Sequence, residues 1–349
     1  MRLITSTGYY STGSSAVTDL INECDGVCAL GDYEFRFVQD PDGICDLEYN
    51  LVLNNHRHNS GYAIKRYEKN VKFLNGGRII KKYNRFFGGE WKRLSAEYVN
   101  KLVDVEYKGF WHQELRDKGK VAYFIERAVN KIAHKVFRMN RDKGISIFLR
   151  NNTNYATYPS EKFYEYTREY IDALFSCVNK ENKPFVMADQ LVPVSNTSHY
   201  LRFFNDLKVI CVERDPRDIY IAEKMMYKGT VVPNNAHDFC IWYRATRAHK
   251  AEEHDDPERI LRINFEDLVY DYDACSAKIL EFCGIDASLH TRKKTLFDPD
   301  KSIANTRLCE KYPALADDIA YIEKNLPDAL WDEADKCKAV GADGNGETL

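Results

Sequence analysis

The sequence predicts an α/β fold in which a mainly parallel sheet is flanked by helices. Short apolar runs alternate along the chain with segments of helical periodicity. These runs are continuously apolar rather than alternating, which is typical of parallel strands that helices cover on both faces. In addition, the first apolar run passes through a glycine-bearing turn into a helical pattern, which is the start of a strand–loop–helix unit.

The same patterns place the elements in order. Strands are expected at residues 2–6, 33–38, 145–149, 184–188, 208–213 and 259–263. Helices are expected at 14–23, 61–73, 95–108, 120–139, 160–178, 216–227, 235–250 and 272–283. Residues 50–143 show no strand pattern, so we expect a basic helical cap insertion there, within one domain that spans residues 1–335. The polar segment 340–349 is expected to be a disordered tail.

The loop after the first strand has the spacing of a phosphate-binding loop. Residues 8–15 read GYYSTGSS, which fits G-x-x-x-x-G-x-[ST], although Ser14 stands where a nucleotide triphosphatase carries lysine. Backbone N–H groups and the following helix N-terminus still favour an anion, and the loop adds hydroxyl donors. These hydroxyls belong to Ser11, Thr12, Ser14 and Ser15. A serine/threonine-rich turn with an N-cap serine explains the same residues.

A second anion-binding pattern follows the strand at 208–213. The strand runs into Arg214-Asp215-Pro216-Arg217-Asp218, and Pro216 suits a first helical turn. Arg214 and Arg217 therefore lie at the carboxyl end of a strand, where ligands bind in open α/β sheets. Two arginines there can bind a phosphate or sulfate in bidentate fashion. Local pairing of the arginines with neighbouring carboxylates is the alternative.

Together these segments resemble the sulfotransferase superfamily, whose members move a sulfuryl group from 3′-phosphoadenosine 5′-phosphosulfate (PAPS) to an acceptor hydroxyl or amine. Residues 10–15 resemble the family's 5′-phosphosulfate loop, and residues 214–218 resemble R-[DN]-P-[KR]-D, whose first arginine binds the 3′-phosphate. A third match is the [YF]-E-D-L turn at residues 265–268. The resemblance implies a P-loop-like fold in which Ser11, Thr12, Gly13, Ser14, Ser15, Arg214 and Arg217 bind the nucleotide.

Two positions depart from the family pattern. The loop usually carries a lysine or arginine where this chain has Ser11, and a second 3′-phosphate contact is often a serine where this chain has Ala222. A cation from elsewhere would have to serve at the phosphosulfate. Near the C-terminus, the segment 301–305 resembles the loop that closes on the nucleotide, which adds Lys301 and Ser302 to the binding residues.

Two carboxylates are candidates for the general base that removes the acceptor proton. Glu34 resembles the catalytic glutamate of glycan-modifying sulfotransferases, and its aromatic neighbours suggest a desolvated carboxyl. Arg36 shares the predicted strand face of Glu34 and is a candidate for the missing cation, and an exposed Glu–Arg pair on an edge strand is the alternative. Asp189 is the second candidate, because it follows a strand where smaller-acceptor sulfotransferases place a histidine; it could equally cap the next turn.

Composition predicts a reduced, soluble, cytoplasmic protein. Hydrophobic residues make up 44% of the chain, and no apolar run approaches the length needed to span a bilayer. The first strand begins directly after Met1, which leaves no room for a signal peptide. Most of the ten cysteines fall in apolar runs and none forms a C-x-x-C pair, so we expect core thiols and no metal site.

The charge is strongly uneven, which suggests an anionic partner. Residues 57–143 contain 22 Lys and Arg against 9 Asp and Glu, a net charge of +13 in a chain whose total is −3. Aromatic residues are interleaved with these bases, as in sites for polyanions. PAPS, an anionic or sulfated saccharide and a nucleic acid all fit, with nucleic acid the weakest choice, and a solvated helical surface is the alternative.

The leading hypothesis is a PAPS-dependent sulfotransferase with a carbohydrate-like acceptor and no metal requirement. A P-loop nucleotide kinase or hydrolase that lacks the Walker lysine is one alternative. A non-catalytic member of the fold that binds a polyanion is the other.

Overall fold

The computed structural model describes residues 1–31, 33–76, 83–109, 113–136, 152–158 and 162–331. Contacts divide the chain into two compact units. The first unit consists of Met1–Gln39 and Phe175–Leu349, and the second is the intervening segment Asp40–Leu174. The predicted tail at 340–349 and the predicted strand at 145–149 lie outside the described residues.

The first unit contains a five-stranded, fully parallel sheet with strand order β2-β5-β1-β6-β7. The strands are β1 (Arg2–Gly8), β2 (Val27–Ala29), β5 (Phe185–Met187), β6 (Leu207–Glu213) and β7 (Ile260–Asn264). Ile4 of β1 lies opposite Met187 on one side and Lys208 on the other. The carboxyl ends of β1 and β6 therefore lie at one edge, followed by the two motifs that the sequence singled out.

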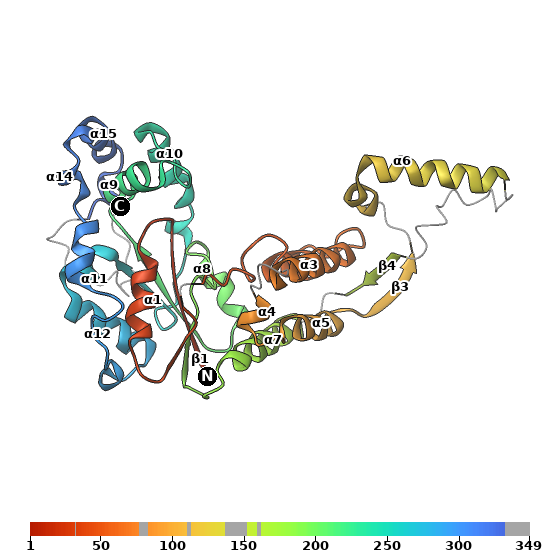
Figure 1. The fold of residues 1–349 in the computed structure, drawn as a ribbon, viewed down its shortest axis with the longest axis horizontal. Coiled ribbons are helices and arrows are strands. Elements are labelled where there is room, and N and C mark those ends of the chain that lie inside the picture. Colours follow the sequence, from red (N-terminus) through yellow and green to blue (C-terminus); the bar gives the residue numbers. More distant parts are fainter. Residues whose placement is uncertain (32, 77–82, 110–112, 137–151, 159–161, 332–349) are drawn as a thin grey trace. The chain divides into compact units, whose positions relative to one another are not determined.

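Burial explains why the central strands are continuously apolar. Val209, Ile210, Cys211 and Val212 are fully buried, because helices cover the sheet. One face packs against α1 (Ser14–Asn22), α11 (Phe265–Tyr270) and α12 (Tyr272–Cys283), which Figure 1 shows beside the sheet. The predicted α/β class, a parallel sheet flanked by helices, is confirmed.

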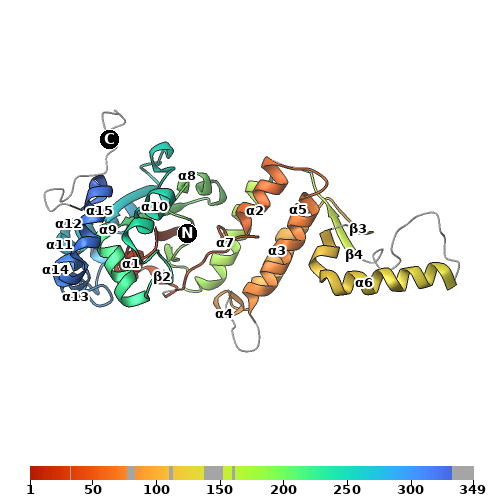
Figure 2. The same cartoon turned by 90° about the horizontal axis from the view of Figure 1, so that it is seen from above.

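A second apolar cluster joins helices beyond the end of β6, which Figure 2 shows from above. It is formed by α9 (Pro216–Ala222), α10 (Ala236–Thr246), α14 (Leu308–Lys311) and α15 (Ala316–Asn325). A π-helical turn, Glu223–Tyr227, continues α9. The unit also contains α8 (Thr197–Tyr200) and α13 (Pro299–Ser302). The remaining turns are 3₁₀ helices at Leu201–Phe203, Lys250–Glu252, Ala287–Leu289, Ile303–Asn305, Pro313–Leu315 and Pro327–Ala329.

The second unit is mainly helical and has an aromatic core. Its helices are α2 (Ile44–Glu48), a π-helical turn at Tyr49–Leu53, α3 (Ser60–Asn75), α4 (Tyr83–Phe86), α5 (Trp91–Leu102) and α6 (Gln113–Val136). The start of α7 (Lys162–Val178) also belongs to it. Tyr98 and Tyr170 stack with ring centroids 4.6 Å apart, and the Trp91 indole N–H donates to the Val71 carbonyl at 2.9 Å. No helix among the described residues is long and apolar enough to cross a membrane.

Several predicted elements were wrong or missed. The single helix expected at 95–108 ends at Leu102, and β3 (Val105–Gly109) follows it, paired antiparallel with β4 (Asn152–Ala156). The segment 50–143 therefore does contain a strand. Residues 33–38 do not form a strand, because Phe35 and Phe37 are buried individually in an irregular segment. The short strand β2 carried too few residues for its pattern to be noticed.

Candidate functional site

The loop between β1 and α1 adopts the conformation of a close-fitting turn. Ser11 and Gly13 both lie in the left-handed region, with φ of 59° and 83°. A Cβ atom on Gly8 would meet the Thr12 hydroxyl oxygen at 2.0 Å, so a larger residue at position 8 would not fit beside it. The N-terminus of α1 has neither a side-chain cap nor an acidic residue in its first turn. Its free N–H groups and positive end favour a bound anion.

Two cavities meet this loop, both within the first unit. The loop cavity has a volume of about 540 Å³ and includes Ser11, Thr12, Gly13, Ser14 and Ser15 in its lining. Glu34, Arg36, Asp189, Gln190 and Trp242 also line it. The arginine cavity has a volume of about 420 Å³ and is lined by Ser11, Gly13, Ser15, Arg214, Ser302 and Asn305, among others. The loop residues thus face the candidate bases in one cavity and Arg214 in the other.

Asp189 is a buried carboxylate at the end of β5. Only 5% of the residue is exposed, and Oδ1 accepts a hydrogen bond from the Ser6 hydroxyl at 2.8 Å. Burial raises the pKa of Asp189 to about 6, and the negative charge of Glu34 contributes, while hydrogen bonds from Ser6 and Thr18 oppose the shift. A carboxylate with a pKa in this range can accept a proton near neutral pH.

Glu34 and Arg36 lie together, although not on a strand. Oε2 of Glu34 is 3.5 Å from a guanidinium nitrogen of Arg36, and both side chains are substantially exposed. The expectation that aromatic neighbours desolvate Glu34 was wrong, because Phe35 turns into the core while 54% of the Glu34 side chain is exposed. The irregular backbone is held by the Phe35 N–H, which donates to the Asp189 carbonyl at 2.8 Å. The structure therefore places all three predicted catalytic residues on the loop cavity.

Arg214 bridges the loop and the C-terminal part of the chain. Its guanidinium donates to the carbonyls of Ser11 at 2.7 Å and Asn305 at 2.6 Å. It also lies over the Phe265 ring, 5.3 Å from the centroid, and Phe265 in turn packs where a side chain on Gly13 would lie. Local pairing with a carboxylate does not explain Arg214, because the hydrogen bonds found go to backbone carbonyls.

Arg217, by contrast, is paired locally. It forms ion pairs with Asp215 at 2.7 Å and with Glu323 at 2.9 Å. Asp215 caps α9 by accepting from the Arg217 N–H, and Pro216 occupies the first turn, as the sequence predicted. Lys301 is highly exposed and pairs with Asp298 at 3.0 Å, whereas Ser302 lines the arginine cavity. Of these three predicted nucleotide-binding residues, the structure brings only Ser302 to the cavities at the loop.

Two polar residues that contact the loop, Gln190 and Glu223, were missed, and Gln190 also lines the loop cavity. Gln190 accepts from the Thr7 hydroxyl at 3.1 Å and donates to the Ser14 hydroxyl at 3.0 Å, which ties the end of β1 to the start of α1. Its φ of 55° is an uncommon conformation that the sequence did not signal. Glu223, fully buried next to the loop, accepts a hydrogen bond from the Ser11 hydroxyl, and its other oxygen has no hydrogen-bond partner among the described residues.

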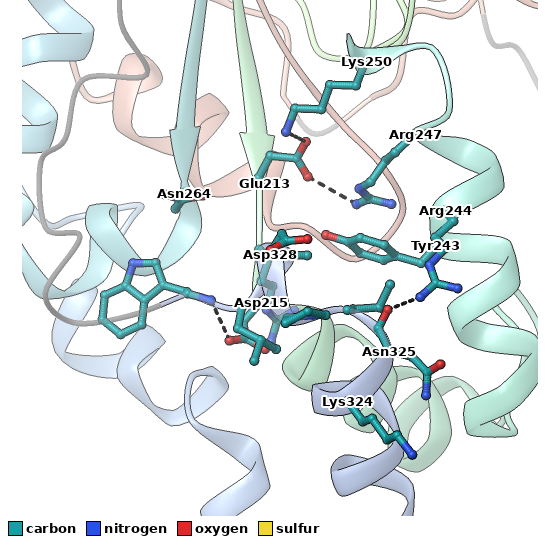
Figure 3. Close-up of a pocket in the computed structure, with 16 residues that line it drawn as sticks. Glu213, Asp215, Tyr243, Arg244, Arg247, Lys250, Asn264, Lys324, Asn325 and Asp328 are labelled. Carbon is teal, nitrogen blue, oxygen red and sulfur yellow. Dashed lines mark hydrogen bonds and ion pairs between the residues drawn. The ribbon is translucent and has the colours of Figure 1, made fainter. Parts of the chain in front are cut away.

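A third cavity, of about 860 Å³, lies beyond the ends of β6 and β7 (Figure 3). Arg247 separates it from the loop, with its guanidinium between the rings of Tyr9 and Tyr243 at 3.8 and 3.6 Å from their centroids. Glu213 holds this arginine at 3.2 Å and also pairs with Lys250 at 3.1 Å. Tyr243 and Arg247 are four residues apart at the end of α10, but Tyr9 comes from the loop after β1, so the sequence did not reveal the stack.

The F-E-D-L turn at residues 265–268 holds the backbone of the arginine motif, residues 214–218, through hydrogen bonds. Glu266 is almost fully buried, and its carboxyl accepts from the Asp215 N–H at 2.9 Å. Burial raises the pKa of Glu266 to about 8, with a further contribution from the charges of Asp215 and Asp218. Asp267 accepts from the Trp331 indole N–H at 2.9 Å. Glu266 and Asp267 thus support the backbone around Arg214 without lining either cavity, whereas Phe265 of the same turn lines the arginine cavity.

Comparison with known proteins finds one family model that matches the chain. A model of the sulfotransferase family matches residues 94–289, more than half of the chain. The match includes the arginine motif and the F-E-D-L turn, and it begins after the loop at residues 9–13. No curated protein matches the chain.

Three solved structures are similar at low identity. The sulfotransferase domain of the Synechococcus PCC 7002 olefin synthase is 13% identical over 93% of each chain, with a TM-score of 0.38. Sulfotransferase STF9 from Mycobacterium avium is 12% identical, with 88% of this chain and 68% of that chain covered and a TM-score of 0.33. Sulfotransferase STF1 from Mycobacterium tuberculosis H37Rv is 12% identical, with 88% and 76% covered and a TM-score of 0.32. On the family match, which confirms the resemblance drawn from the three motifs, the chain belongs to the sulfotransferase family.

Proposed function

We propose that the protein is a PAPS-dependent sulfotransferase. The observation that supports this most directly is that Ser11, Ser15 and Arg214 line one cavity, although they come from motifs about two hundred residues apart. A donor with anionic groups at both ends of its ribose needs two such anion sites. The loop, with the α1 N-terminus, would hold the 5′-phosphosulfate, and Arg214 the 3′-phosphate.

The backbone N–H groups of the loop and the hydroxyls of Thr12, Ser14 and Ser15 suit the 5′ end, while the Ser11 hydroxyl already donates to Glu223. They can donate to a phosphosulfate without any change in backbone conformation, since the left-handed residues Ser11 and Gly13 already shape the turn. Arg214 in this structure satisfies two backbone carbonyls, so binding of the 3′-phosphate would replace or share those hydrogen bonds. Ser302 would close the same cavity with its hydroxyl. No metal is needed for these contacts.

We further propose that Asp189 is the general base. The acceptor oxygen would attack sulfur, the bond from sulfur to the bridging phosphate oxygen would break, and the acceptor proton would pass to Asp189 Oδ2. Adenosine 3′,5′-bisphosphate is the leaving product. The raised pKa of Asp189 and its place on the loop cavity support this role. Sulfuryl transfer depends mainly on positioning and charge stabilisation, as phosphoryl transfer does.

Glu34 and Arg36 are proposed to act as a pair in the same cavity. Arg36 is the cation from this cavity that could replace the missing loop lysine, and Glu34 holds it at 3.5 Å. Because Glu34 is exposed, it can also contact the acceptor, and it remains the second candidate for the base. Arg217 and Lys301 are proposed only as neighbours that shape the charge around the nucleotide.

The proposed acceptor is a carbohydrate or another anionic molecule. The basic segment 57–143, rich in aromatic residues, supports this choice, and we propose that it acts as the cap of a single catalytic domain. The cysteines in the described part of the chain form no disulfide bond, which supports our proposal that the protein works in the reducing cytoplasm.

One assay tests this function. The full chain is incubated with PAPS and a panel of neutral and anionic saccharides in the presence of EDTA, and release of adenosine 3′,5′-bisphosphate is followed. We expect metal-independent release that Arg214→Ala reduces strongly and Lys301→Ala leaves nearly unchanged. A parallel incubation contains Mg²⁺-ATP and no EDTA. Hydrolysis of ATP there, without any release from PAPS, would instead support a nucleotide hydrolase. Binding of PAPS with no turnover on any acceptor would support a non-catalytic binding protein.

A further inference from the structure

The second half of α6 carries an apolar stripe that is exposed to solvent. Gly119, with φ 78° and ψ 167°, interrupts the helix, so the continuous part is residues 120–136. Six large apolar side chains in this part are between 37% and 74% exposed. They are Val121, Phe124, Ile125, Val129, Ile132 and Val136. Contiguous apolar surface of this kind on a soluble unit marks an interaction site.

The spacing of these residues puts them on one face of the helix. They recur at intervals of three and four positions, and at 100° per residue they fall within an arc of roughly 140° that also includes Ala128. The helix is about 25 Å long at 1.5 Å per residue. It is therefore a regular amphipathic helix whose apolar face is exposed, while the core of the second unit is formed by other elements.

The polar face is basic. Lys120, Arg127 and Lys131 lie along one flank of the stripe, and Lys135 lies just inside the stripe on the same side; all four residues are exposed. Their long aliphatic stems can lie along an apolar surface while the charged ends remain in a polar layer. The acidic residue in this part of the helix, Glu126, is already paired with Lys118 at 2.7 Å.

Asp117, which lies before the glycine break in α6, connects the helix to its own unit. Asp117 accepts a hydrogen bond from the Tyr62 hydroxyl at 2.7 Å and forms an ion pair with Lys69, both on α3. The glycine break follows two residues later. The stripe thus begins beyond the attachment point.

We propose that residues 120–136 of α6 dock the protein on an anionic membrane surface. An apolar face flanked by Lys and Arg matches a bilayer interface, where acyl chains receive the stripe and anionic headgroups receive the bases. A second copy of this chain fits less well, because it would bring two rows of positive charge together. A nucleic acid offers no apolar surface for valine and isoleucine side chains. The helix lies in the interface and does not span it.

This inference does not depend on the proposed function, and its test uses binding alone. The full chain is sedimented with vesicles of neutral phosphatidylcholine or of phosphatidylcholine with anionic phosphatidylglycerol. We expect binding to the anionic vesicles that weakens as salt rises, because each basic residue near the surface contributes about a fivefold factor in affinity. Arg127→Glu with Lys131→Glu should reduce binding more than tenfold.

The apolar stripe is tested with uncharged variants. Phe124→Ser with Ile125→Ser should reduce binding more than tenfold, since each large apolar side chain buried contributes roughly a tenfold factor. Asn130→Ser, on the opposite side of the helix, is the matched control and should bind as the unchanged protein does. Circular dichroism and the melting temperature check that the exposed substitutions leave the fold intact.

Three results would overturn the proposal. The first is equal binding to neutral and anionic vesicles, and the second is no binding to either. The third is a dimer that forms without vesicles and dissociates in Phe124→Ser, which would show that a second copy covers the stripe.

Discussion

Replacing Asp189 by Asn should make the protein more stable and less active. The folded state raises the pKa of this carboxyl from its ordinary value of 3.8 to about 6, chiefly through burial. A folded-state pKa above the unfolded value means that the native protein holds the proton more tightly. The free energy of unfolding is therefore highest, as far as Asp189 is concerned, below about pH 4. It falls progressively as the pH rises towards 6 and stays at the lower value above that.

The size of the effect follows from the shift. Since each pH unit of difference is worth about 1.4 kcal/mol, the ionised Asp189 costs the fold up to about 3 kcal/mol at pH 7. Asparagine keeps an oxygen that can accept from the Ser6 hydroxyl but carries no charge. Asp189→Asn should therefore raise the free energy of unfolding at pH 7 by up to that amount and change it little at pH 4. Turnover should fall roughly 10²- to 10⁴-fold, the range typical of a lost general base.

Urea unfolding at pH 4 and pH 7, together with initial rates of sulfuryl transfer from pH 5 to 8, measures both effects. In the unchanged protein, turnover should rise with pH through about 6 as Asp189 loses its proton. Glu34→Gln is the control, since its exposed side chain should leave stability unchanged. A gain in stability that is equal at both pH values would refute the burial argument. Full activity in Asp189→Asn with loss in Glu34→Gln would show that Glu34 is the base.

Three further predictions concern the anion sites and the basic segment. Arg214→Ala should weaken binding of adenosine 3′,5′-bisphosphate roughly ten- to a hundredfold, the value of a charge-assisted hydrogen bond. Because the Arg217 side chain is paired with Asp215 and Glu323, Arg217→Ala should instead change the melting temperature more than the affinity. Calorimetry and thermal unfolding separate the two effects, and equal losses of affinity in both variants would contradict the assignment. Glu223→Gln should tighten nucleotide binding roughly three- to tenfold in the same calorimetry, because it removes a buried negative charge that faces Ser11. Weaker binding would show that the carboxylate is needed to shape the loop. If the segment 57–143 binds an anionic acceptor, the Michaelis constant for the acceptor should rise steeply as salt rises through the screening range. A Michaelis constant that does not respond to salt would assign these charges to solubility.

The sequence was sufficient where a pattern is local and strong. The strand at 208–213 and the helix after it were predicted within a residue at their starts, because a buried apolar run, a capping Asp215 and a first-turn Pro216 all point to the same boundaries. The strand–loop–helix at 2–23 was predicted for the same reason. At 33–38 an aromatic run predicted a strand, but Phe35 and Phe37 are buried in the core without pairing to another strand. Burial alone therefore explains the aromatic residues there.

The site was only partly predictable, because its chemistry depends on contacts between distant segments. The local sequence predicted that Arg214 and Arg217 both bind the nucleotide. In the structure, however, Arg217 pairs with Glu323, whereas Arg214 donates to the carbonyls of Ser11 and Asn305. The stack of Arg247 between two tyrosines likewise needs the loop and α10 to be adjacent in space. No spacing rule reports such a contact.

Calorimetry of the full chain with adenosine 3′,5′-bisphosphate and with adenosine 5′-phosphate tests directly whether the loop and Arg214 hold one donor. Both ligands can occupy the loop at Ser11–Ser15, but only the first can also reach Arg214 with a phosphate. We predict that the bisphosphate binds roughly ten- to a hundredfold more tightly, the contribution of one charge-assisted contact, and that Arg214→Ala removes most of the difference. Equal affinities for the two nucleotides in the unchanged protein would contradict the two-site account of the donor.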